Sequence, residues 1–140
     1  MDRDAHFQAF KARLESNPSL HVYDHDAPLD ADGQVVHATY VILYDLGPDD
    51  LDDDRFTAPQ RADSTATYRC VAKIVAETPF AVRQVLKVVD GLLIKAKLTV
   101  QGRSVDPVRL DNAGPIKRDT DISPPLYFAE NDYTAVTREA

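Results

Sequence analysis

The chain has 140 residues, of which 44% are hydrophobic and 28% are charged, a balance typical of one globular domain with a buried core. Its formal net charge of −7 argues against a module that binds nucleic acid through phosphates, because such modules need a clustered basic surface. The lone Cys70 excludes an intramolecular disulfide, and the sequence has neither a long apolar run nor a basic, apolar N-terminus, so we expect no membrane span and no secretory signal.

The first predicted element is an amphipathic helix over residues 2–16. Phe7, Phe10 and Leu14 recur at helical spacing, and charged residues occupy the positions between them. Pro18 disfavours helical geometry at the residue before it, so the helix should end there. The sequence therefore predicts a helix with one apolar face at the start of the chain.

Three strands are predicted in the next part of the chain. Residues 20–23 form a short strand candidate, and a polar connection follows it. Residues 37–47 are apolar and rich in β-branched side chains, and we expect this strand to end at Gly47 and Pro48. Residues 64–76 alternate, which predicts a strand with Ala66, Tyr68, Cys70 and Ala72 on one face.

The second half of the chain begins with the strongest helix pattern. Thr78 is a suitable N-cap, Pro79 suits the first helical position, and the apolar spacing continues as far as Leu93. Residues 98–111 then predict two short strands, 112–125 a long loop, and 126–136 the final strand. Strands that follow one another in blocks predict an α+β fold, a single domain over 1–140 with a mostly antiparallel sheet covered by two helices.

The residue types needed for catalysis or metal binding are present without a convincing arrangement. His21 and His25 could supply a metal site, but this segment reads as strand and loop, so surface histidines are the simpler interpretation. Cys70 lies inside a predicted strand and is expected to be a buried, inert thiol. We therefore expect no enzymatic activity, no catalytic residue, no bound metal and no cofactor.

An acidic segment is the main charge feature of the sequence. Residues 45–54 hold six aspartates in ten positions: Asp45, Asp49, Asp50, Asp52, Asp53 and Asp54. A solvated loop is the simplest interpretation. The alternatives are a loose divalent-cation site, or a loop that contacts a partner or lines a channel.

With these motifs placed, the sequence resembles the tail terminator, or tail completion, proteins of long-tailed bacteriophages, in particular those of phages of actinobacteria. The resemblance covers nearly the whole chain and includes "TYVILYDLG", "TYRCVA" and "TPFAVRQVLKVVDGLL". It is densest in "LTVQGRSVDPVRLD" and "GPIKRDTDISPPLYFAENDYT". The matching features there are a Gly-Arg turn at Arg103, an aspartate loop with Asp119 and Asp121, and a proline-led aromatic strand with Tyr127 and Tyr133.

The resemblance implies an α+β sandwich and a structural role in the virion. Tail terminators form a ring, usually of six copies, that caps the head-proximal end of the tail tube, stops its polymerisation and joins it to the neck. The implied partners are other copies of the chain, the major tail tube protein, the head-neck connector or stopper protein, and phage DNA in transit. The implied location is the tail-neck junction of the virion, with assembly in the cytoplasm of the bacterial host.

Two interpretations of the final strand remain open at this stage. Tyr127 and Tyr133 are an even number of residues apart, so an unbroken strand places both on one face. They could line a subunit or tube interface together with Arg103, Asp119 and Asp121, at a sheet edge whose start Pro124 fixes. Alternatively, the tyrosines pack under the helices.

Other functions are also compatible with the sequence. A head-closure or stopper protein of the phage neck is the nearest alternative. A small metal-dependent hydrolase that uses the aspartates, or a monomeric adaptor, would belong to different classes.

Overall fold

The computed structural model describes residues 1–50 and 65–140, and of Asp49 and Asp50 only the backbone. Helix α1 (Arg3–Glu15) begins at Asp2, whose carboxylate accepts a hydrogen bond from the Ala5 amide at 2.9 Å. Its buried residues are His6, Phe7, Phe10 and Leu14. The predicted N-terminal helix and its apolar face are therefore confirmed.

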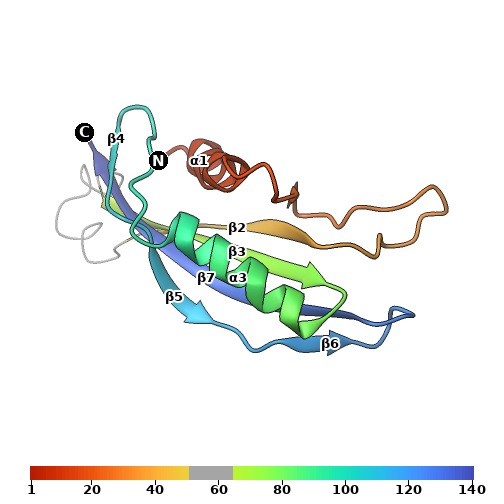
Figure 1. Cartoon of the computed structure of the whole chain (residues 1–140). Coiled ribbons are helices and arrows are strands. Elements are labelled where there is room, and N and C mark those ends of the chain that lie inside the picture. Colours follow the sequence, from red (N-terminus) through yellow and green to blue (C-terminus); the bar gives the residue numbers. More distant parts are fainter. Residues whose placement is uncertain (51–64) are drawn as a thin grey trace.

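A seven-stranded sheet forms the body of the described residues, with the order β1-β2-β3-β7-β4 (Figure 1). The long strands are β2 (Tyr40–Asp50), β3 (Thr65–Ala76) and β7 (Leu126–Glu139). The short ones are β1 (Val22–Asp24), β4 (Arg103–Val105), β5 (Arg109–Ala113) and β6 (Lys117–Asp119). Only β1 runs parallel to its neighbour, and every other described pair is antiparallel.

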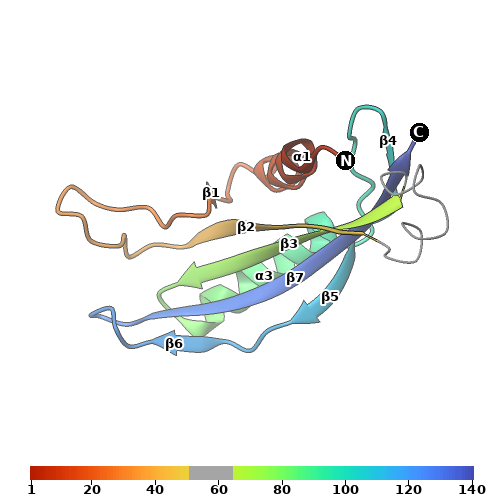
Figure 2. The same ribbon diagram turned by 180° about the vertical axis from the view of Figure 1, so that it is seen from behind.

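The two described helices lie on the same side of this curved sheet. Helix α3 (Pro79–Leu93) crosses β3 and β7, in front of them in Figure 1 and behind them in Figure 2. It begins at Thr78, whose hydroxyl accepts a hydrogen bond from the Ala81 amide at 3.1 Å. The structure thus confirms the predicted N-cap, the position of Pro79 and the α+β class.

Alternation along the long strands gives the sheet two faces. On the helix-covered face, β3 contributes Tyr68, Cys70 and Ile74 to a core that also includes Phe10 and Val89 of the helices. The opposite face is called the open face below. At one end it carries a smaller apolar cluster made by Tyr40, Ile42, Val75 and Leu126.

Three expectations about the strands are wrong. The strand expected to stop at Gly47 continues to Asp50, because a bulge between Asp45 and Gly47 lets pairing with β3 resume. The expected loop over 112–125 contains the end of β5 and all of β6. The final strand, β7, was expected at a sheet edge but is internal. Strand β3 pairs along one side of it, and β4, β5 and β6 follow one another along the other.

Among the described residues, no helix has both the length and the apolar character needed to cross a bilayer.

Candidate functional site

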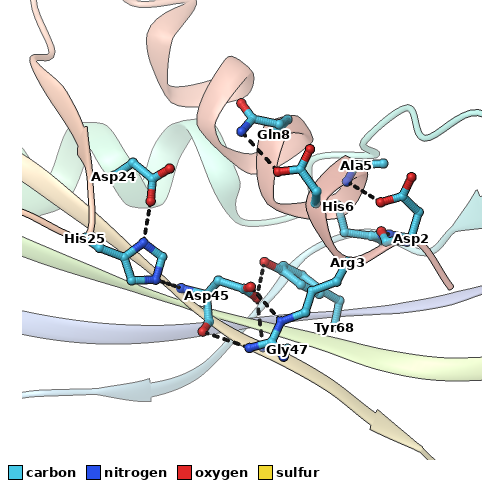
Figure 3. A network of polar contacts seen from close by, with 11 residues as sticks. Asp2, Arg3, Ala5, His6, Gln8, Asp24, His25, Asp45, Gly47 and Tyr68 are labelled. Carbon is cyan, nitrogen blue, oxygen red and sulfur yellow. Dashed lines mark hydrogen bonds and ion pairs between the residues drawn. The ribbon is translucent and has the colours of Figure 1, made fainter.

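Asp45 joins α1 to the sheet through a polar network (Figure 3). One carboxylate oxygen accepts from the Arg3 guanidinium at 2.6 Å. The other accepts from the Tyr68 hydroxyl at 2.8 Å and from the Gly47 amide at 2.9 Å. Tyr68 is fully buried, and its burial together with this hydrogen bond raises the pKa of the phenol, so it stays a donor. Asp45 therefore connects α1, β2 and β3 within the subunit.

Gly47 makes the bulge beside Asp45 possible. Its φ of +81° lies in the left-handed region, and a Cβ atom there would lie 2.6 Å from the Arg3 guanidinium carbon. Past this bulge, β2 carries Asp49 and Asp50 opposite Thr67 and Ala66 of β3. The predicted acidic loop thus begins as paired strand, while Asp52, Asp53 and Asp54 lie outside the described residues.

His25 packs against the same network (Figure 3). Its Nε2 accepts from the Asp45 backbone amide at 3.2 Å, and Nδ1 contacts the Asp24 carboxylate. Its ring also contacts the rings of Phe7 and Tyr44. Within residues 1–50 and 65–140, no group of three potential ligands is arranged to hold a metal ion.

Tyr133 belongs to the core beneath α3. It is fully buried, and its hydroxyl donates to the carboxylate of Asp90 on α3. Asn131 reaches both groups, with its amide nitrogen 3.4 Å from each. Burial and the bond to Asp90 raise the pKa of Tyr133. Packing under the helix, one of the two open interpretations, therefore describes Tyr133, which has no exposed surface to offer a partner.

Tyr127 and Arg103 also point to the helix-covered side. Tyr127 is partly buried against the same core, so the two tyrosines share a face as predicted. Arg103 follows the predicted turn at Gly102, whose φ is +76°, and its Nε donates to the Thr137 hydroxyl at 3.1 Å.

That hydroxyl continues a buried chain of hydrogen bonds to His6. Thr137 Oγ1 lies 2.9 Å from Nε2 of His6, whose Nδ1 lies 2.6 Å from the Asp2 carbonyl oxygen. Because a carbonyl only accepts, Nδ1 carries the hydrogen and Nε2 accepts from the Thr137 hydroxyl. Burial lowers the pKa of His6, so the neutral ring is favoured. Sequence patterns gave no sign of this series of hydrogen bonds, in which His6 and Thr137 are 131 residues apart.

Asp119, the last residue of β6, lies beside Asp121 in the turn that follows. The Asp119 carboxylate accepts from the Asp121 backbone amide at 3.1 Å, and Asp121 is exposed. Asp119 also lines a cavity on the open face that encloses about 130 Å³. The predicted site residues are therefore divided between the two faces of the sheet.

This cavity was not predicted from the sequence. It is mainly apolar, and its walls include Tyr40, Ile42, Val75, Ile122, Leu126 and Phe128. They come from three neighbouring strands and the connection before β7, a juxtaposition that depends on strand register. Lys73 stands at its side, with its ammonium 4.6 Å from the centre of the Phe128 ring.

Two carboxylates and one lysine lie on the open face next to this cavity. Glu130 and Asp132 line an adjoining hollow that also shares Phe128 and includes Lys117. Burial, followed by the nearby charges of Asp111 and Glu130, raises the pKa of Asp132. An apolar cavity and an acidic hollow therefore lie side by side.

No protein-family model matches the sequence, and no curated protein matches it either. Among solved structures, a chain described as "Virion of native gene transfer agent (GTA) particle" aligns over 94% of this chain and 90% of its own, with a TM-score of 0.62 and 16% identity. A second solved structure, whose name states no function, aligns over 96% of both chains with a TM-score of 0.60 and 16% identity. At this identity the likeness shows a shared fold over nearly the full length of each chain.

Proposed function

We propose that this protein is a structural component of a phage-type virion, and more specifically a tail terminator. The observation that carries the proposal is the near end-to-end likeness of the fold to a chain of a gene transfer agent virion. The motif order of the C-terminal third supports the same conclusion independently, because it resembles the tail terminator pattern from Gly102 to Tyr133.

The proposed role depends on contact between surfaces. Six copies would close into a ring on the head-proximal rim of the tail tube, stop its growth and receive the neck. A subunit suits such a ring when it presents two different surfaces to two neighbours, as the helix-covered and open faces of this sheet can do. The proposed partners are the tail tube protein and the connector or stopper protein, with DNA passing through the centre.

The acidic segment has a proposed part in this assembly. Six copies at −7 each would carry about −42, a charge that repels DNA in a bore and attracts a basic partner. We favour docking onto a basic partner, through Asp49, Asp50, Asp52, Asp53 and Asp54. Replacing these five with asparagine should slow the joining of tails to heads and remove its dependence on salt. Unchanged joining and unchanged DNA ejection would reject both roles of the segment.

Deletion of the gene from its phage or particle tests the main proposal. Tails assembled without the protein should be overlong and headless in electron micrographs, because nothing caps the growing tube. Complementation with the wild-type chain is the control and should restore one tail length. Tails of normal length that fail to join heads would indicate a stopper of the neck instead, and normal particles would refute a role in assembly.

A further inference from the structure

The outer surface of α3 carries an aromatic side chain that the described residues leave largely exposed. Phe80 is 62% exposed, and Val88, two helical turns further on, is 38% exposed. Exposed Arg83 and Lys87 lie beside this apolar stripe, one and two turns beyond Phe80. A large apolar residue flanked by cations is a common composition for a contact surface.

The open face offers a matching receptor. Its apolar cavity of about 130 Å³ is close in size to the roughly 150 Å³ of an apolar cavity that holds benzene. It can therefore accept one phenyl ring. Phe80 cannot reach the cavity of its own subunit, because α3 covers the opposite face of the sheet.

Two carboxylates of the acidic hollow are spaced like two cations of α3, and Lys117 of the hollow and Lys73 of the cavity wall lie beside them. Along α3, Arg83 and Lys87 lie about 4.5 Å and 10.5 Å beyond Phe80. Along β7, Glu130 and Asp132 lie about 7 Å and 13 Å beyond Phe128, the residue shared by the cavity and the acidic hollow. Long basic side chains can bridge the differences.

We propose that the outer surface of α3 docks onto the open face of a second copy, with Phe80 in the apolar cavity and Arg83 and Lys87 facing Glu130 and Asp132. The contact is heterologous, because the two copies contribute different surfaces. Repetition of such a contact gives a closed ring when the rotation closes. The inference rests on the proposed ring and assigns the surfaces that would build it.

Cysteine cross-linking tests this contact with full-length protein. Full-length Phe80→Cys is mixed with a size-tagged Ile122→Cys, which has its thiol at the wall of the cavity, and the mixture is mildly oxidised. Cys70 does not interfere because it is fully buried, and its burial raises the pKa of the thiol. Phe80→Cys mixed with Leu46→Cys is the matched control, since Leu46 is exposed, is not part of α3 and lines neither the cavity nor the acidic hollow.

The expected product is a disulfide-linked pair of one Phe80→Cys chain and one Ile122→Cys chain, well above the control. A chain carrying both substitutions should give a ladder that ends at the number of subunits in the ring. Cross-links mainly between two Phe80→Cys chains would overturn the proposal in favour of a symmetric helix contact. Cross-linking at the level of the control, even at the highest attainable protein concentration, would overturn it too. That result would indicate that Phe80 and Val88 contact a different protein.

Variants of the two surfaces provide a second measurement by sedimentation. Phe80→Ser, and Ala27→Trp, which fills the cavity, should each weaken self-association roughly tenfold or more, while Leu46→Ser leaves it unchanged. Unaltered association of both variants would refute the docking. Tail length in the gene deletion is independent of these tests. The docking can therefore be refuted while the tail terminator role stands. Equally, normal tails in the deletion would refute that role while the cross-linking still supports the docking.

Discussion

Replacing Asp45 with alanine is expected to destabilise the fold by about 2–4 kcal/mol, mostly because the buried Tyr68 hydroxyl loses its hydrogen-bond acceptor. Tyr68 is fully buried and donates its hydroxyl hydrogen to Asp45. An unpaired buried hydroxyl costs about 1–3 kcal/mol, and loss of the charge-assisted bond from the Gly47 amide adds to this. The Arg3 contact contributes less, because 54% of its side chain is exposed and such ion pairs are worth at most about 1 kcal/mol.

A double-mutant cycle separates these contributions. Tyr68→Phe should destabilise the wild-type protein by about 1 kcal/mol, because it removes one hydrogen bond. The same change should stabilise the Asp45→Ala variant, because it removes the unpaired hydroxyl. Arg3→Ala should cost at most about 1 kcal/mol in the wild type.

Urea unfolding followed by circular dichroism measures the free energy of unfolding of the wild type, the three single variants and the double variant. The reasoning is refuted if Tyr68→Phe has the same effect in both backgrounds, or if Arg3→Ala costs as much as Asp45→Ala. Either result would mean that Asp45 stabilises the fold through the exposed ion pair with Arg3, and that the buried Tyr68 hydroxyl contributes little to the free energy of unfolding.

Three further outcomes follow from single side chains. Burial lowers the pKa of His6 below its usual 6.5, so the unfolded chain binds this proton more readily. Stability should therefore be full above about pH 6.5 and fall as the pH drops below it, and His6→Gln should show a smaller drop between pH 7.5 and 5 in thermal melts. Tyr133→Phe should cost about 1 kcal/mol in urea unfolding by leaving Asp90 short of a donor, without changing self-association in sedimentation, since the side chain is buried. Burial and neighbouring carboxylates raise the pKa of Asp132, so Asp132→Asn should raise the melting temperature at pH 7 but not at pH 3, where the native carboxyl is already neutral.

Local patterns were sufficient to predict the helices and most strands. The spacing of Phe7, Phe10 and Leu14 and the Thr78-Pro79 start are signals carried by neighbouring residues, and both predicted helices are present. The alternation from Ala66 to Ala72 likewise places the right residues in the core.

Features that depend on distant pairing could not be predicted in the same way. Gly47 and Pro48 usually end a strand, but here Arg3 and Tyr68 hold Asp45 so that β2 continues beyond a bulge. Lys117–Asp119 has no strand pattern of its own, and its strand is defined by pairing with β7.

The same limit applies to the candidate surfaces. The final strand looked like an edge because nothing in its sequence reveals that three short strands cover its outer side. The cavity on the open face needs the register of three strands at once, so no single stretch of sequence could indicate it.

Locating the protein in finished particles tests the central claim most directly. Particles carrying a C-terminally tagged chain, labelled with gold and viewed by electron microscopy, should show label at one place, where the tail tube meets the neck. Label along the whole tube, label at the far tip, or complete particles without the protein would contradict a ring that caps the tube.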